Sequence, residues 1–398
     1  MKRRDFLGTP LVAFAPIASS STSAFAQSQT SRSSTFDPWI EVHRAHLLHN
    51  ADQVARLASR PILAVIKNNG YGLGVTNVAR VLETHQRIAG FAVVKLQEAI
   101  DLRDAAIKKP VVLMGPFDEA DLREAVARRV APMVYTPIGD LLQKEAQRLG
   151  SAVPIHVCVD TGIGRVGVPY LDAPALIRDL AVRPGITIDG TMMTFTEDSS
   201  FDREQRRRFA ELTDGLTRSG VRLGRRHAAS TYTLFQHDDA AFDMVRPGMA
   251  LIGIYPEPAF RSPNRMDLKP ALALRVRVAY VKRLAAGTSA GYERAYLAKR
   301  DTWVATLPIG HVDGWPRVAA KGARVRINGR AYPVIASVSA SHTILEIGDE
   351  QMVKAGDIAT LFDWEPGFRP EDVAAACGAS VYDLTMHLNP LLPRRVLA

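Results

Sequence analysis

The alternation of short apolar runs with helical stretches constrains the fold of this chain more than any other feature. It begins with a short strand and an amphipathic helix expected over residues 39–58, and it continues to about Pro270. Apolar runs follow at residues 62–67, 90–95, 110–115, 131–136, 154–160 and 186–193, with shorter ones near 227–230 and 249–254. Helices are expected between them, among others at residues 96–106, 119–129 and 201–216. Eight strands alternating with helices predict an α/β fold, a (β/α)8 TIM-like barrel whose active site lies at the C-terminal ends of the strands.

Beyond Pro270 the pattern changes to apolar residues at every second position, which is typical of strands with one buried face. Such segments lie at residues 273–284, 302–310, 323–340 and 358–365. The dipeptide Asn328-Gly329 inside the third segment favours a tight hairpin turn. The sequence therefore predicts a barrel domain over residues 39–270 and a C-terminal antiparallel β domain over residues 271–398.

Residues 1–26 have the order of an export signal: a basic start, a short apolar stretch and small residues before the cleavage site. The pair Arg3-Arg4, followed by Asp-Phe-Leu, resembles a twin-arginine signal, which exports proteins in the folded state. A Ser/Thr-rich linker is expected over residues 27–38. The apolar stretch is too short and too broken by prolines to span a bilayer. We therefore predict a periplasmic protein whose contact with the membrane is through its export signal alone.

Composition describes an ordinary soluble globular protein, with 47% hydrophobic and 23% charged residues, and excludes disordered and collagen-like chains. The formal charge is +9, but the basic residues are scattered among acidic ones, so a solvated basic surface is expected and no nucleic-acid site. Cys158 and Cys377 are the only cysteines and lie far apart, which argues against a zinc site. A single long-range disulfide between them stays open.

The segment AVIKNNGYGLG at residues 64–74 places Lys67 at the end of a buried strand, before a glycine-rich loop that carries Tyr71. Burial lowers the pKa of a lysine ammonium and so supplies the neutral amine that forms a Schiff base with an aldehyde. Taken alone, the pattern equally fits a strand-end lysine that extends into solvent.

This segment resembles the lysine motif of the alanine racemase family, whose members use pyridoxal 5′-phosphate (PLP). The resemblance continues in register through residues 160–167, 242–253, 290–296, 307–317 and 327–330, and it covers roughly residues 39–356. Ordered motifs across two domains are much more specific than one glycine-rich loop. The resemblance implies PLP as the cofactor and an amino-acid racemase, which is an isomerase.

The resemblance also implies a cofactor site. Lys67 would bind PLP covalently, and its phosphate would contact Tyr71, Ser230 and the backbone amides of Gly248 and Met249. Without the resemblance, Ser230 and Gly248 are ordinary turn or cap residues.

Two arginines match further cofactor contacts of the family. Arg246 would face the pyridine nitrogen, where a permanent cation keeps that nitrogen unprotonated and argues against a decarboxylase, which has a carboxylate there. Arg165 would lie near the phenolic oxygen and the substrate; on its own it is equally a surface ion-pair residue.

Tyr292 matches the second catalytic base of the family. Racemisation requires acid/base groups on both faces of Cα, with Lys67 acting on the D enantiomer and Tyr292 on the L enantiomer. In the family this tyrosine comes from the partner subunit, so a homodimer with shared active sites is implied. By itself Tyr292 fits a half-buried strand tyrosine.

The chain departs from the family at two cofactor contacts. Cys158 stands where many alanine racemases have a carbamylated lysine that orients Arg165, so Arg165 must be held in another way. Thr194 replaces a histidine that stacks on the pyridine ring.

The predicted substrate entrance departs further. His311 replaces a tyrosine, although Asp313 and Arg317 persist around it. Ala340 and Ser341 stand where the family commonly has a Met-Asp pair that contacts the substrate. Smaller and uncharged side chains here predict a substrate larger than alanine, or a broad set of amino acids.

Near the C-terminus, Asn389-Pro390 occupies the approximate place of a tyrosine that closes the pocket over alanine. Two other readings stay open: a different PLP reaction on the same fold, such as aldol cleavage or dehydration of a D-β-hydroxy amino acid, and a PLP- or amino-acid-binding protein without catalysis. The aldolases and dehydratases need a metal ion, for which the sequence has no convincing ligand cluster, and mere binding does not need Tyr292. The sequence does not identify the amino acid.

Overall fold

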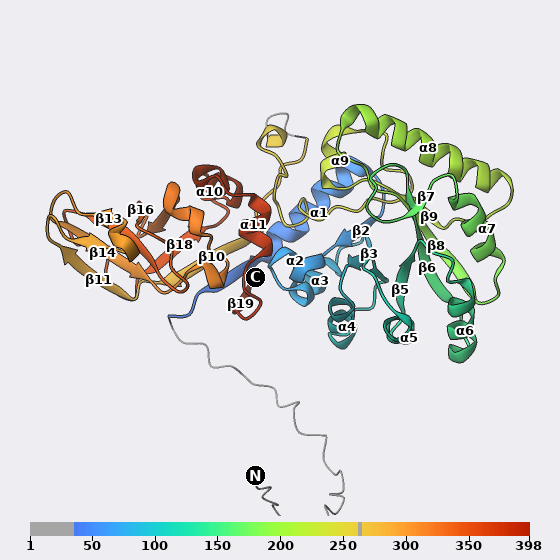
Figure 1. Ribbon diagram of the computed structural model, residues 1–398, viewed down its shortest axis with the longest axis horizontal. Coiled ribbons are helices and arrows are strands. Elements are labelled where there is room, and N and C mark those ends of the chain that lie inside the picture. The colour runs from blue at the N-terminus through green and yellow to red at the C-terminus, as the bar shows by residue number, and fades with distance from the viewer. Residues whose placement is uncertain (1–35, 262–264) are drawn as a thin grey trace, which may run out of the picture. The chain divides into compact units, whose positions relative to one another are not determined.

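A ring of parallel strands forms the first domain of the computed structural model, which describes residues 36–261 and 265–398 (Figure 1). In the described part of the chain seven strands follow one another around this ring: β2 (Ile62–Val65), β3 (Ile88–Val93), β4 (Val111–Leu113), β5 (Val130–Val134), β6 (Val153–Asp160), β8 (Ile186–Met192) and β9 (Arg225–His227). The short β7 (Val168–Pro169) pairs with β6 outside this path. Their side chains are almost all buried, because helices cover the outer face of such a sheet.

The ring closes through single-residue bridges. Val245 bridges Ile62 of β2, and Met244 bridges His227 of β9. The strand predicted at residues 249–254 is wrong, since successive turns occupy this segment, and β9 lies earlier than the strand predicted at 227–230. At the eighth strand position of the ring, only Met244 and Val245 of the described residues form bridges. Pro247 follows them and has no N–H to continue the β-ladder.

Helices lie between the strands and on the outside of the ring (Figure 1). They are α1 (Arg44–Ala58), α2 (Lys67–Tyr71), α3 (Val75–Leu82), α4 (Leu96–Asp104), α5 (Glu119–Ala127), α6 (Gly139–Leu149), α7 (Ala173–Val182), α8 (Ser199–Arg218) and α9 (Thr231–Gln236). α4, α5 and α8 confirm the predicted helices. α8 begins where the Asp198 side chain accepts hydrogen bonds from the amides of Ser200 and Phe201, and it packs Phe209 and Leu216 into the core.

The C-terminal domain is built on a sheet that, among the described residues, has nine strands in the order β11-β14-β17-β16-β15-β18-β10-β1-β19. The bounds are β1 (Trp39–His43), β10 (Leu272–Arg277), β11 (Tyr280–Leu284), β14 (Thr302–Leu307), β15 (Arg324–Ile327), β16 (Arg330–Ile335), β17 (Thr343–Gly348), β18 (Ile358–Phe362) and β19 (Arg394–Leu397). The pairings are antiparallel except that of β1 with β19, which is parallel. The predicted antiparallel β domain is thus confirmed.

Smaller elements complete this domain. A two-stranded ribbon consists of β12 (Ser289–Ala290) and β13 (Tyr296–Leu297), and two helices follow β18, α10 (Pro370–Cys377) and α11 (Val381–Met386). Asn328 and Gly329 both have positive φ, 51° and 77°, and join β15 to β16 in the predicted hairpin.

β1 was expected within the range of the barrel domain, but it pairs with β10 and β19 of the C-terminal sheet. The predicted signal at residues 1–26, and residues 27–35 of the predicted linker, lie outside the described residues. Among the residues that are described, no helix has the length and apolarity needed to cross a membrane.

Candidate active site

The turn after β2 presents Lys67. Asn68, Asn69, Gly70 and Tyr71 follow it with φ of 54°, 55°, 62° and 53°, so the backbone takes a complete left-handed turn. Each L-residue in this conformation costs about 1–2 kcal/mol, less for asparagine, and glycine adopts it freely. Hydrogen bonds must therefore hold the turn.

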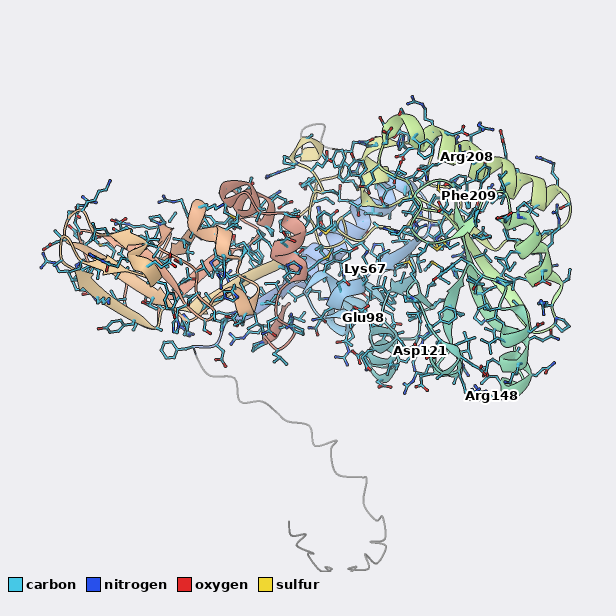
Figure 2. All side chains as sticks on the ribbon, viewed as in Figure 1. Lys67, Glu98, Asp121, Arg148, Arg208 and Phe209 are labelled. Atoms are coloured by element: carbon cyan, nitrogen blue, oxygen red, sulfur yellow. The ribbon has the colours of Figure 1, made fainter. Side chains whose placement is uncertain are left out.

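Glu98, near the start of α4, supplies one of these hydrogen bonds. Its buried carboxylate accepts from the backbone amide of Asn69 at 2.8 Å and from those of Val94 and Lys95 at 3.3 and 3.2 Å. Figure 2 labels Glu98 and Lys67, which both belong to the barrel. Glu98 was not among the predicted site residues, because a glutamate in the first turn of a helix is normally read as a capping residue.

The environment of Lys67 favours its neutral amine. Burial lowers the pKa of the Lys67 ammonium most, the positive charge of Arg165 lowers it further, and the carboxylate of Glu98 opposes both. A lowered pKa favours the neutral amine, which is the form of lysine that acts as a nucleophile and a base.

Lys67 opens into a cavity of about 930 Å³ at the C-terminal ends of the strands, the end expected for a barrel active site. Every residue predicted to bind the cofactor lines this cavity: Lys67, Tyr71, Arg165, Ser230, Arg246, Gly248 and Met249. The structure therefore brings together residues from three of the matching motifs and Ser230, which lies outside them.

One end of the cavity suits a phosphate. A Cβ at Gly248 would lie 2.2 Å from the Tyr71 hydroxyl, so only glycine fits there. The buried backbone amide of Met249 has no acceptor among residues 36–261 and 265–398, which leaves a donor for an anion. These features fit the phosphate of PLP.

Thr231 is a further residue of this end that the sequence analysis missed. Its hydroxyl accepts hydrogen bonds from the amides of Gly248 and Ala250, both at 3.1 Å, and it lines the cavity. The neighbouring Ser230 hydroxyl instead accepts from the Thr233 amide at 3.3 Å and caps α9. In the sequence, the second hydroxyl residue directly after Ser230 was the feature that could have indicated Thr231.

Arg246 is buried and held by carbonyls and a histidine. Its guanidinium donates to the carbonyl oxygens of His227 at 2.6 Å and Met193 at 2.9 Å, and to His227 Nδ1 at 3.1 Å. It also lies 3.4 Å from the Thr194 hydroxyl, which stands where the family has a ring-stacking histidine. Burial lowers the pKa of Arg246 to about 10, so the group remains a cation at neutral pH.

A second histidine extends this network. Because a guanidinium can only donate, His227 Nδ1 accepts and His227 Nε2 carries the proton that it donates to His156 Nδ1 at 2.8 Å. Burial, with Arg246 nearby, lowers the pKa of His156 to about 4 and that of His227 well below its usual value. Both imidazoles are therefore neutral at pH 7.

Arg165 is exposed, and among the described residues no hydrogen bond or ion pair holds its guanidinium. Its loop is ordered by the Asp160 carboxylate, which accepts from the amides of Gly162 at 2.8 Å and Gly164 at 3.1 Å. Arg208 of α8 donates to the Thr161 carbonyl at 2.9 Å. The loop, rather than a side-chain partner, thus places Arg165.

Cys158, predicted to stand at the position of the carbamylated lysine, is buried in the cavity wall. Burial raises the pKa of its thiol to about 11. Cys158 and Cys377 are both free thiols, so the disulfide that the sequence left open is not formed.

The predicted second base and the entrance residues do not line this cavity. They lie on the C-terminal domain: Tyr292, His311, Asp313, Arg317, Ala340 and Ser341. Tyr292 is 74% exposed, in the loop between β12 and β13. The entrance residues do meet one another, since Arg317 lies 3.1 Å from His311 and the His311 amide donates to the Ser339 carbonyl at 3.0 Å.

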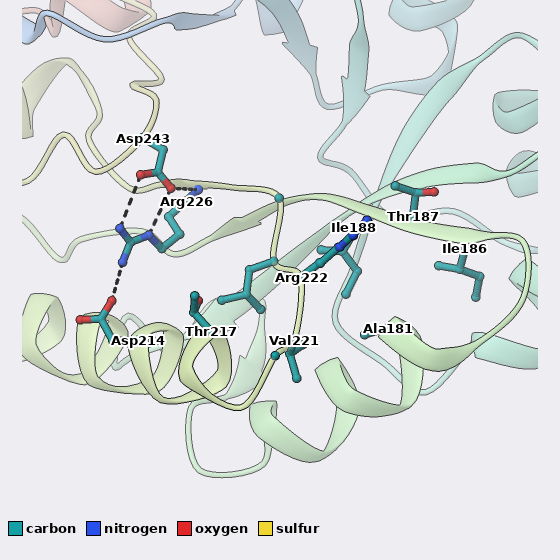
Figure 3. Close-up of a pocket in the computed structure, with 13 residues that line it drawn as sticks. Ala181, Ile186, Thr187, Ile188, Asp214, Thr217, Val221, Arg222, Arg226 and Asp243 are labelled. Atoms are coloured by element: carbon teal, nitrogen blue, oxygen red, sulfur yellow. Dashed lines mark hydrogen bonds and ion pairs between the residues drawn. The ribbon is translucent and has the colours of Figure 1, made fainter.

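A second large hollow, of about 810 Å³, lies at the N-terminal end of β8 (Figure 3). Arg226 points toward it, but its guanidinium is paired with Asp214 at 2.7 Å and Asp243 at 3.1 Å. None of the predicted site residues lines this hollow, so the chemistry is concentrated at the Lys67 cavity.

Comparison with known proteins agrees with this geometry. Residues 42–256 match the model of the alanine racemase N-terminal domain, and residues 271–396 match that of the C-terminal domain. An alanine racemase from Symbiobacterium thermophilum is 31% identical over 89% of this chain and 96% of its own. One from Sorangium cellulosum is also 31% identical, over 89% and 97%.

Solved structures agree as well. The alanine racemase of Streptomyces lavendulae superposes with a TM-score of 0.84 at 25% identity, over 91% of this chain and 97% of its own. A histidine racemase from Leuconostoc mesenteroides superposes with a TM-score of 0.81 at 25% identity, over 91% and 98%. The chain belongs to the alanine racemase family and is a PLP-dependent amino-acid racemase.

Proposed function

We propose that this racemase acts on a free amino acid larger than alanine, or on a broad set, by proton transfer between Cα and two bases, Lys67 and Tyr292. The observation that carries the proposal is the composition of one cavity. It contains Lys67, whose pKa is lowered, the buried cation of Arg246, and an anion cradle formed by Gly248 and the amide of Met249.

The residues of the cavity have distinct tasks. Lys67 would hold the cofactor covalently, and Tyr71, Thr231 and the amide of Met249 would bind its phosphate. When bound, PLP supplies a conjugated ring that withdraws electrons from Cα and so acidifies the Cα proton. Arg246, which has no lone pair to accept a proton, would keep a ring nitrogen placed beside it unprotonated.

Once the substrate amine has displaced it from the cofactor, Lys67 Nζ is a free amine that would take a proton from Cα, or return it, on its own face of the substrate. The Tyr292 hydroxyl does the same on the opposite face. Under this assignment Lys67 acts on the D enantiomer and Tyr292 on the L enantiomer.

Tyr292 lies on the exposed surface of the C-terminal domain and does not reach the cavity of its own chain. This arrangement supports a homodimer in which each subunit supplies Tyr292 to the cavity of the other. Sedimentation or light scattering of the purified protein tests it, and an active monomer would exclude it.

Small side chains support the larger substrate. Ala340 and Ser341 are exposed beside the predicted entrance, and Thr194 and Cys158 leave room in the cavity wall. One methylene of room is worth about 1–3 kcal/mol in selectivity. The histidine racemase that shares this fold is named for an amino acid larger than alanine.

The test is hydrogen exchange at Cα. The PLP-loaded protein is incubated in D2O with a panel of L-amino acids, and the α-proton is followed by NMR beside chiral chromatography. Deuterium at Cα of large amino acids together with their D enantiomers is expected. Exchange confined to alanine would refute the substrate proposal. A product other than the D enantiomer would favour a different PLP reaction, such as aldol cleavage.

We place the enzyme in the periplasm, because a cofactor that is bound in the cytoplasm requires export of the folded protein and residues 1–26 resemble a signal for that route. Replacing both Arg3 and Arg4 with lysine should retain the protein in the cytoplasmic fraction. Periplasmic recovery of that variant would contradict a twin-arginine route.

A further inference from the structure

Arg394, the first residue of β19, joins two segments that are far apart in the sequence. Its Nε and Nη2 donate to the Gly72 carbonyl at 3.1 and 3.0 Å. Its Nη1 donates to the carbonyls of Asn389, Pro390 and Leu392 at 2.9, 2.7 and 2.6 Å. The guanidinium therefore bridges the Lys67 turn and the segment 389–392.

All the described hydrogen-bond partners of the Arg394 guanidinium are backbone carbonyls. Among residues 36–261 and 265–398 no carboxylate forms an ion pair with Arg394, and burial lowers the pKa of its guanidinium to about 10. Desolvating a cation without a counter-charge is unfavourable. What the guanidinium provides in return is a planar fork that fixes two backbone segments at once.

The first segment belongs to the catalytic turn. Gly72 directly follows Tyr71 and has φ of 91°, and a Cβ there would lie 2.2 Å from the Thr385 carbonyl at the end of α11. Asn68 donates to the Met386 sulfur at 3.4 Å, and α2 and α11 are in contact (Figure 1). The C-terminal residues thus pack directly on the turn that presents Lys67.

The second segment leads to the entrance. The Asn389 amide donates to the Asp313 carbonyl at 3.2 Å, and Asn389 Nδ2 donates to the Val312 carbonyl at 3.2 Å. A continuous series of hydrogen bonds therefore runs from Gly72 through Arg394 and Asn389 to residues 310–314, the entrance loop that contains Asp313.

We propose that Arg394 is a positioning residue that fixes the segment 389–392, and through Asn389 the entrance loop, relative to Lys67. It does not contact the reacting atoms; it holds the loop at the predicted substrate entrance. This rests on the proposed roles of Lys67 and of the entrance loop. Arg394 therefore governs substrate binding and selectivity more than proton transfer.

The test compares Arg394→Lys with Arg395→Lys in the PLP-loaded enzyme. Lysine keeps the charge of Arg394 but cannot bridge as a fork, whereas Arg395 is exposed, with its guanidinium 4.4 Å from the Trp39 ring centre, and controls for the substitution itself. Arg394→Lys should raise KM for a large amino acid about tenfold and change kcat by less than about threefold. Arg395→Lys should change neither.

Amide hydrogen exchange of the same samples gives a readout that needs no substrate. Peptides that cover residues 68–74 and 386–392 should exchange about tenfold faster in Arg394→Lys than in the parent, and at the parental rate in Arg395→Lys. Should Arg394→Lys fail to fold, Asn389→Ala replaces it, with faster exchange at residues 310–314 and a raised KM.

Unchanged exchange in Arg394→Lys would show that Arg394 does not hold the two segments together, and a fall in kcat at constant KM would show that it acts on proton transfer. Either result overturns the proposal. If the parent enzyme turns over no amino acid, the proposed function fails, while the exchange measurement still decides whether Arg394 joins the two segments.

Discussion

Individual residues of the cavity act through the groups that surround them. Arg246 remains charged while two carbonyls and the neutral His227 imidazole accept its hydrogen bonds, and the pKa of Lys67 is lowered because it is buried beside Arg165. The same burial that suits these groups to catalysis makes the protein sensitive to acid.

His156 is the residue in which this sensitivity can be measured. Its pKa is lowered from 6.5 to about 4 by burial, so the unfolded chain binds a proton between these values and the folded chain does not. Stability is therefore present above pH 6.5 and is lost as the pH falls toward 4, by about 2 kcal/mol between pH 7 and pH 5. Urea unfolding of the parent and of His156→Gln at both pH values measures it. Equal losses in the two proteins would show that His156 is not responsible.

The hydroxyls of Thr231 and Ser230 should differ in function. Thr231→Val removes the acceptor of the Gly248 and Ala250 amides and a hydroxyl at the anion cradle, so PLP affinity should fall about tenfold or more. Ser230→Ala removes the cap of α9 and should lower the free energy of unfolding by about 1 kcal/mol. Titration of each apoenzyme with PLP, followed by visible absorbance, separates them, and a larger loss in Ser230→Ala would reverse the assignment.

At the scale of elements, the site depends on two backbone segments that approach more closely than side chains allow. The left-handed turn at Lys67 and the loop at Gly248 meet at the Tyr71 hydroxyl, and Glu98 holds the turn from α4. A Cβ in this contact must displace one segment.

Gly248→Ala tests this contact. The new Cβ would lie 2.2 Å from Tyr71 Oη and 2.7 Å from Tyr71 Cζ, so the phenol must move and PLP affinity should fall at least about tenfold. Gly215→Ala, in the last turn of α8, is the matched control, because its Cβ meets only the Arg218 side chain at 3.9 Å and alanine favours a helix by up to about 1 kcal/mol. Retained PLP affinity in Gly248→Ala would show that the loop at Gly248 can move away from Tyr71 without loss of PLP binding.

At the scale of the whole molecule, the proposed second base, Tyr292, lies outside the Lys67 cavity of its own chain. Lys67 lies in the barrel cavity, whereas Tyr292 is exposed on the C-terminal domain, so under the proposed mechanism the site would be completed by a second copy of the chain.

Mixing two inactive variants tests this arrangement. Lys67→Ala and Tyr292→Phe should each lose nearly all racemase activity, whereas co-expression should restore about a quarter of it, because half of the dimers are mixed and each mixed dimer has one intact site. Activity of the co-expressed sample no higher than that of either variant, with mixed dimers present, would mean that both bases act from one chain.

The sequence by itself determined the features that depend on local pattern. The apolar runs predicted six of the barrel strands, the period-two segments predicted the C-terminal sheet, and the Asn-Gly pair predicted the hairpin, because burial and turn conformation impose short periodicities on neighbouring residues. The ordered motifs predicted the cavity lining from Lys67 to Met249. Pairing of β1 with β10, in contrast, left no trace in the local pattern.

Only the tertiary structure decided the contacts between distant segments. Glu98 with the Asn69 amide, Thr231 with the Gly248 amide and Arg394 with the Gly72 carbonyl each join a side chain to backbone far along the chain. A backbone amide or carbonyl carries no residue identity, so no motif records which side chain it binds. The folded backbone, rather than the pattern of residue types, selects these partners.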